Sequence, residues 1–272
     1  MNPIDVAFQR LRARGKKAFI PFITAGDPNL EATSLLVRSL AGHGASLIEV
    51  GFPYSDPIAD GPVIQASYTR ALAKGVKVDD IFHCLQSGSR SLGLSSEKVP
   101  LVAMLSYTLV HRRDPDTFIS RALEAGISGA IVPDLPVDEA KDLAAVAAAR
   151  NFKLILLVTP TTPKERAIEI ARTSTGFLYC VSIAGITGER DRLPKELIGQ
   201  LTWLRKQTDL PICVGFGIST PEQARQLREV TDGIIVGSAL VRRLEQAESR
   251  PIDQIAEEIS SISQTLADAL NP

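Results

Sequence analysis

The sequence predicts an α/β protein, a TIM (β/α)8 barrel with an additional N-terminal helix. Short apolar runs alternate with amphipathic stretches, eight such runs occur, and 272 residues suit eight strand–helix units in one domain, residues 1–272. The eight runs are AFIPFIT (18–24), SLIEV (46–50), VPLVAML (99–105), GAIVPD (129–134), KLILLV (153–158), GFLYCVS (176–182), PICVGF (211–216) and GIIVG (233–237).

The runs are typical of parallel strands that are covered on both faces. Each is short, rich in β-branched residues and nearly continuous in hydrophobicity. The stretches between them have helical spacing, with caps at their starts or glycines at their ends. They cover 30–44, 114–126, 137–151, 164–173, 194–208 and 220–230. A doubly wound sheet is the alternative, but it predicts a GxGxxG turn after the first strand, where the chain reads TAGDPN (24–29).

The N-terminal segment, MNPIDVAFQRLRARGKK, reads as an amphipathic helix that Asn2 caps, with Pro3 in its first turn. It lacks the apolar centre of a signal peptide. The chain carries 30 Lys+Arg against 31 Asp+Glu, which gives no reason to expect nucleic acid or a membrane surface as a partner. No apolar stretch approaches the ~20 residues of a membrane span. We therefore expect a cytoplasmic protein.

Cysteine and histidine usage predicts neither a disulfide framework nor a metal site. The three cysteines are far apart, and no two histidines have metal-ligand spacing. Cys180 and Cys213 lie inside apolar runs, so we expect small buried hydrophobes there.

Glycine-bearing segments follow the last two predicted strands, GFGISTPEQ (215–223) and GSAL (237–240). Their glycines allow backbone amides to approach a ligand, and barrels often bind phosphate after strands seven and eight. The helix after Ser238 presents free amides to the same space. Ordinary turns are the alternative, with Thr220 and Gln223 forming a capping box. Two such segments on consecutive strands favour a phosphate site.

The segment after the sixth predicted strand, SIAGITGERDRLP (182–194), combines two glycines, two hydroxyl residues and a run of charge. A long loop of this kind at the catalytic face suits a lid, with Thr187 inside it and Gly188 helping to hold the phosphate. A solvated connector is the alternative.

Glu49 is the strongest catalytic candidate. Side chains alternate along a strand, and an ionised carboxylate is costly against an apolar helix layer, so Glu49 is expected in the barrel mouth with Leu47 below it. Desolvation there favours the neutral form, which suits a group that gives and takes a proton near neutral pH. A structural ion pair with a basic side chain is the alternative.

The roles of three aspartates are less clear from the sequence pattern than the role of Glu49. Asp60 precedes Gly61 and Pro62 and looks like a helix N-cap. Asp56 lies in a Ser-Asp-Pro turn, and Asp27 reads as a cap rather than a catalyst.

Six segments together resemble the tryptophan synthase α subunit, in order and over the whole chain. They are PFITAGDP (21–28), EVGFPYSDPIADGPVIQ (49–65), PDLPVDE (133–139), GITG (185–188), GFGIST (215–220) and GSAL (237–240). The resemblance implies a TIM-barrel lyase that splits indole-3-glycerol phosphate into indole and glyceraldehyde 3-phosphate. It implies that Glu49 and Asp60 are the catalytic pair and that Tyr179 orients Asp60 through a hydrogen bond.

The resemblance also assigns binding residues and a partner. Phe22 and Leu105 would be apolar walls around the indole, and the phosphate would be held by Gly188, Gly217, Gly237 and Ser238. The chain would need no cofactor of its own, because pyridoxal phosphate belongs to the β subunit of an α2β2 assembly. Pro53, Asp56 and Pro57 would face that subunit. The segment MLSYTLVHRR (104–113) departs from the family pattern, because it lacks the usual asparagine.

Two other functions remain open on the sequence. One is a different phosphosugar barrel, such as an isomerase or indole-glycerol-phosphate synthase. The other is a binding module that mainly regulates a β partner.

Overall fold

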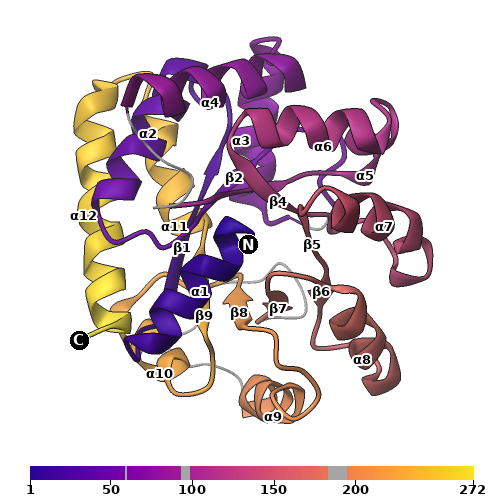
Figure 1. Ribbon diagram of the computed structural model, residues 1–272. Coiled ribbons are helices and arrows are strands. Elements are labelled where there is room, and N and C mark those ends of the chain that lie inside the picture. Colours follow the sequence, from indigo (N-terminus) through magenta and orange to yellow (C-terminus); the bar gives the residue numbers. More distant parts are fainter. Residues whose placement is uncertain (59, 93–98, 183–194) are drawn as a thin grey trace.

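A computed structural model describes residues 1–58, 60–92, 99–182 and 195–272, and it confirms the barrel. All strand pairs are parallel, in the order β5-β4-β3-β2-β1-β9-β8-β7-β6, with helices around the strands (Figure 1). The strands are β1 (Ala18–Thr24), β2 (Ile48–Gly51), β3 (Leu101–Met104), β4 (Ile127–Ile131), β5 (Lys153–Ile155), β6 (Leu157–Val158), β7 (Leu178–Val181), β8 (Ile212–Gly215) and β9 (Gly233–Val236).

The fifth apolar run forms two strands where the sequence predicted one. β5 pairs with β4 and β6 pairs with β7, and Leu156 lies between them. The Leu156 amide donates to the Ser174 hydroxyl at 3.2 Å instead of to a strand partner, which interrupts the ladder. Each of the eight runs therefore still supplies one position of the barrel.

Helices fill the connections between the strands. They are α1 (Pro3–Ala13), α2 (Leu30–Gly42), α3 (Pro62–Ala73), α4 (Val78–Leu92), α5 (Tyr107–His111), α6 (Pro115–Glu124), α7 (Lys141–Ala149), α8 (Lys164–Thr173), α9 (Lys195–Leu204), α10 (Pro221–Arg228), α11 (Ser238–Val241) and α12 (Ile252–Leu270), with 3-10 turns at Val137–Glu139 and Arg242–Gln246. The C-terminal α12 packs beside α2 (Figure 1). No helix within the described ranges combines the length and apolar character that a membrane span requires.

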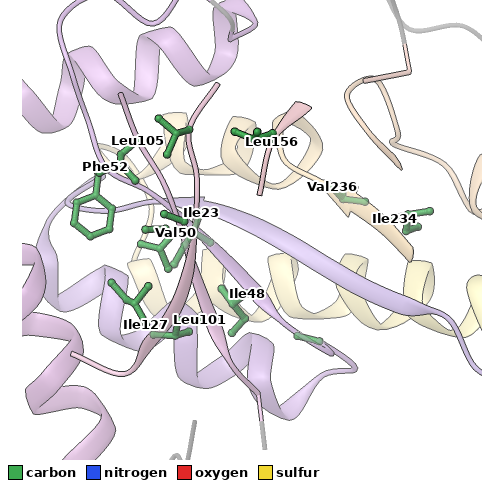
Figure 2. Close-up of a cluster of buried hydrophobic side chains, with 14 of the residues drawn as sticks. Ile23, Ile48, Val50, Phe52, Leu101, Leu105, Ile127, Leu156, Ile234 and Val236 are labelled. Carbon is green, nitrogen blue, oxygen red and sulfur yellow. The ribbon is translucent and has the colours of Figure 1, made fainter. Parts of the chain in front are cut away.

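Two apolar layers divide the core, one inside the barrel and one between strands and helices. Ile23, Ile48 and Val50 belong to the outer layer (Figure 2), whereas Leu47 belongs to the inner one. Because alternate residues of a strand face opposite sides, this placement turns Glu49 toward the barrel interior. Cys180 and Cys213 are buried free thiols in the two layers, as predicted.

The N-terminal helix α1 closes one end of the barrel. Asn2 accepts from the Ile4 amide at 2.9 Å, which confirms the predicted cap. Its side-chain amide donates to the carbonyls of Ser128 and Asn151, which lie at the amino ends of β4 and β5. Ile4 and Phe8 join the inner apolar layer. The amino end of the barrel is thereby filled, and the carboxyl ends of the strands are left for a site.

Candidate active site

A cavity of about 620 Å³ lies at the carboxyl ends of the strands. Residues from β1, β2, β3, β7 and the segments after β8 and β9 line it, so the strand ends converge on one space. Its lining includes Phe22, Glu49, Asp60, Met104, Tyr179, Phe216, Gly217, Gly237 and Ser238. The site is therefore where the barrel rule places it.

Glu49 lies in the wall of this cavity, opposite Phe22 of β1 in the strand register. Its side chain is 1% exposed, and neither carboxyl oxygen has a hydrogen-bond partner among the described residues. Burial, with a smaller contribution from the negative charge of Asp60, raises the pKa of Glu49 to about 8. Nor does any ion pair of Glu49 occur within the described part of the chain. Glu49 is thus a neutral acid at neutral pH.

Asp60 is also buried, at 3% exposed, but its environment differs. One carboxylate oxygen accepts from the Tyr54 hydroxyl at 3.3 Å. Burial raises the pKa of Asp60 to about 6, and the Tyr54 hydrogen bond opposes that rise. Asp60 is therefore mostly ionised at neutral pH, whereas Glu49 is neutral. Two carboxyl groups whose pKa values differ in this way are typical of acid–base sites.

The expectation that Asp60 resembles an N-cap is wrong. Helix α3 begins after Gly61, and no side chain caps it. The expectation for Asp27 is wrong as well, because Asn29 caps α2. Asp27 is buried and forms a two-pronged ion pair with Arg70, at 2.6 and 3.0 Å. Its position before a proline suggested a cap, but the tertiary partner lies 43 residues away and left no local signal.

The hydrogen bond that holds Asp60 comes from Tyr54, not from Tyr179 as the resemblance implied. Tyr179 lines the cavity from β7, and a side chain at Gly215 of β8 would overlap its hydroxyl. Burial raises the Tyr179 pKa, with smaller contributions from the nearby charges of Glu49 and Asp60, which line the same cavity. Sequence reasoning missed Tyr54, although it lies within the same acidic stretch.

The structure also corrects the predicted indole wall. Phe22 lines the cavity, but Leu105 belongs to the outer apolar layer (Figure 2). Met104, one residue earlier, takes the inward position at the end of β3. A shift of one residue changes the face of a strand, so the apolar run alone could not separate these neighbours.

The segments after β8 and β9 meet at the cavity. Gly217 has a φ of 72°, and Phe216 before it has a φ of 73°, a conformation that costs energy for a residue other than glycine. Ser182 donates to the Phe216 carbonyl and helps to hold this turn. Strained residues of this kind occur often at ligand sites. Phe216 gave no signal in the sequence.

The two helix starts beside this turn differ. Thr220 and Gln223 form the predicted capping box at α10, so its first amides are partly satisfied. Helix α11 begins after Gly237, with Ser238 as its first residue, and no side chain caps it. Gly237 and Ser238 therefore offer an uncapped helix start to the cavity. The predicted lid residue Thr187 and phosphate ligand Gly188 lie outside the described residues.

The 53–57 segment follows β2, and its residues differ in exposure. Asp56 is exposed and Pro57 half-buried, but Pro53 is buried, which does not fit its expected place in a partner contact. Ile58, which the sequence did not single out, is 84% exposed. No group of three or more His, Cys, Asp and Glu side chains is placed to hold a metal ion in the part of the chain that the structure describes.

A family model described as tryptophan synthase alpha chain matches residues 8–271. The chain belongs to the tryptophan synthase alpha chain family. A tryptophan synthase alpha chain of Rhodopirellula baltica is 47% identical over 278 residues, covering 100% of this chain and 99% of the relative. One from Microcystis aeruginosa is 45% identical, covering 93% and 94%.

Solved structures agree with the sequence relatives. Tryptophan synthase subunit alpha of Legionella pneumophila superposes with a TM-score of 0.89 at 34% identity, covering 100% of this chain and 99% of that one. A chain of tryptophan synthase from M. tuberculosis, in an aminoacrylate-bound form, has a TM-score of 0.85 at 28% identity, with both chains covered fully. As a tryptophan synthase alpha chain, the protein is a carbon–carbon lyase of tryptophan biosynthesis, and its family implies a β-subunit partner.

Proposed function

We propose that this chain splits indole-3-glycerol phosphate into indole and glyceraldehyde 3-phosphate by a retro-aldol reaction. The observation that carries the proposal is a pair of buried carboxyl groups, Glu49 and Asp60, that line one cavity. Burial raises the pKa of Glu49 to about 8 and that of Asp60 to about 6, so Glu49 is the neutral acid and Asp60 the anion near neutral pH. Breaking a bond at indole C3 needs an acid that protonates C3 and an anion that stabilises the positive charge at the ring nitrogen. Glu49 can supply the acid and Asp60 the anion.

Glu49 moves the proton in both steps. It donates its proton to indole C3, which gives an indolenine whose positive charge extends to the ring nitrogen, and Glu49 becomes a carboxylate. The carboxylate then takes the proton of the substrate hydroxyl as that carbon becomes an aldehyde and the bond to C3 breaks. Glu49 ends protonated, so the cycle closes without a co-reactant.

Asp60 stabilises the charge that develops in the first step. Its carboxylate accepts the indole N–H, and this attraction grows as the ring becomes a cation. The Tyr54 hydroxyl supports the role by holding one carboxylate oxygen. Phe22 and Met104 supply apolar walls from the barrel interior. Tyr179 lines the same cavity from β7 and adds to this wall.

We propose that the phosphate binds at Gly217, Gly237 and Ser238, with Gly188 as a further ligand and Thr187 in a covering lid. The uncapped start of α11 and the open backbone at Gly217 support this placement. Binding the phosphate fixes the glycerol end of the substrate. Interactions remote from the reacting bond thereby position that bond against Glu49.

Replacing Gly217 by valine is expected to raise KM about tenfold with kcat within threefold. A β-branched residue at a φ of 72° is strained by about 1–2 kcal/mol, so the turn must move away from the phosphate. Steady-state kinetics measure this split. Gly199→Ala, at an exposed position of α9 where an added Cβ would meet nothing within 4 Å, is the control. An unchanged KM in the valine variant would remove Gly217 from the phosphate site.

The pH profile of kcat/KM is expected to be bell-shaped between about pH 6 and about pH 8. Asp60 must be ionised, so activity falls as pH drops through its pKa of about 6. Glu49 must be protonated, so activity falls as pH rises through its pKa of about 8. A rate that stays flat from pH 5 to pH 9 would contradict both assignments.

The partner proposal rests on the family and on the exposed residues that follow β2. We propose that Asp56, Pro57 and the exposed Ile58 face a pyridoxal-phosphate β subunit in an α2β2 assembly, to which indole passes. The chain itself would use no cofactor, and residues 1–272 would form a single domain.

Indole release from indole-3-glycerol phosphate by the purified chain, with and without β subunit, tests the proposal. We expect indole in both cases and a faster rate with the partner. Release of no indole in either case would sink the lyase proposal. An isomerase or a synthase would convert other phosphosugars instead, and a purely regulatory module would show no turnover of its own.

A further inference from the structure

Tyr68 has a buried hydroxyl that the mechanism above does not use. It lies on α3, its side chain is fully buried, and its oxygen has no hydrogen-bond partner among the described residues. A buried tyrosine hydroxyl usually has a partner, and an unsatisfied one costs stability. The chain keeps this group where phenylalanine would fill the same space.

The hydroxyl lies next to the catalytic strand. Gly51 is two residues beyond Glu49 on β2, on the same face of the strand. A Cβ placed at Gly51 would be 2.7 Å from the Tyr68 oxygen and 2.5 Å from the tip of the Phe22 ring. The absence of a side chain at Gly51 therefore makes room for both groups beside Glu49.

Glu49 lacks a hydrogen-bond donor and Tyr68 lacks an acceptor among the described residues. Both Glu49 oxygens are buried without a donor among the described residues, and the Tyr68 oxygen is buried nearby without an acceptor. Once Glu49 has given its proton to the substrate, the resulting carboxylate needs a donor, because a buried unpaired charge is costly. Burial and the nearby negative charges raise the pKa of Tyr68, so its hydroxyl keeps the proton that it would donate.

The other titratable groups that face Glu49 fit this need less well. Asp60 repels a second negative charge and already accepts from Tyr54. The buried Cys213 thiol of β8 is only a weak donor. Tyr179 lines the cavity, where substrate reaches it, whereas Tyr68 is outside the cavity lining.

We infer that Tyr68 is a positioning residue whose hydroxyl donates a hydrogen bond to the Glu49 carboxylate after Glu49 has transferred its proton. The catalytic purpose of this contact rests on the proposed function. The position of the Tyr68 hydroxyl beside Gly51, two residues from Glu49, rests on the geometry. The effect of that hydroxyl on the Glu49 titration can therefore be tested without turnover.

Tyr68→Phe tests the inference with two readouts on the full chain. A hydrogen-bond donor to the ionised form lowers a carboxyl pKa, so loss of the Tyr68 hydroxyl should raise the Glu49 pKa by about one unit. ¹³C NMR of the carboxyl carbon follows this titration, and Glu49→Gln assigns the signal. We expect kcat to fall about tenfold or more and KM to stay within threefold, the scale of a hydrogen bond to a charged group.

Thr69→Val is the matched control, because it removes an exposed hydroxyl from the neighbouring position of α3. It should leave both readouts unchanged. If Tyr68→Phe leaves the Glu49 titration unchanged, or if Tyr179→Phe shifts it and Tyr68→Phe does not, the inference is overturned. Failure of the wild type to release indole would instead overturn the proposed function and would leave the titration result to judge Tyr68.

Discussion

Replacing Glu49 by glutamine is expected to abolish indole formation while substrate binding survives. Glutamine has nearly the same shape but carries no transferable proton, and a positioned acid–base group contributes about 10²–10⁴-fold in rate. Indole release measures the loss, and calorimetric titration with substrate measures the binding that remains. Near-normal turnover in this variant would remove Glu49 from the proton-transfer role.

The same variant has a stability signature that separates lost chemistry from lost folding. The folded state raises the Glu49 pKa from 4.5 to about 8, so the unfolded chain loses this proton at lower pH than the folded one. The free energy of unfolding therefore falls as pH rises from about 4.5 to about 8. Glutamine has no such penalty, and Glu49→Gln should melt at a higher temperature than the wild type at pH 8 to 9. Glu257→Gln, at an exposed position of α12, should change neither activity nor melting.

Replacing Asp60 by asparagine is expected to lower kcat at least ~10²-fold, the scale of one electrostatic stabiliser in a buried site. Asparagine retains an oxygen that can accept the indole N–H, but it has no charge to stabilise the cation. Steady-state indole release measures the effect, with exposed Asp253→Asn on α12 as the control. A loss under threefold would leave Asp60 without an electrostatic role.

The fold was predictable because each strand and helix of the barrel has a local sequence pattern, an apolar run or an amphipathic stretch. Each apolar run supplies one barrel position, and the interruption at Leu156 depends on the hydroxyl of Ser174, the residue that follows α8. Glu49 was also predictable, since one charged residue in a buried strand has only one side of the strand where it can lie without a large cost.

Other features of the site depend on contacts between distant or irregular segments. The pattern at Asp60 matched a helix cap, and only the folded loop turns its carboxylate to Tyr54. The choice between Met104 and Leu105 depends on the register of β3, which an unbroken apolar run does not reveal. The left-handed backbone of Phe216 cannot be read from residue types. The same holds for the Tyr68 hydroxyl, which has no hydrogen-bond partner among the described residues.

A crystal structure of Glu49→Gln with indole-3-glycerol phosphate bound would test the site most directly. The variant should hold the intact substrate, because its binding groups are unchanged. We expect the phosphate at Gly217, Gly237 and Ser238, the indole nitrogen within hydrogen-bond distance of Asp60, and C3 against the side chain at position 49. A phosphate bound elsewhere, or an indole nitrogen that points away from Asp60, would contradict the account.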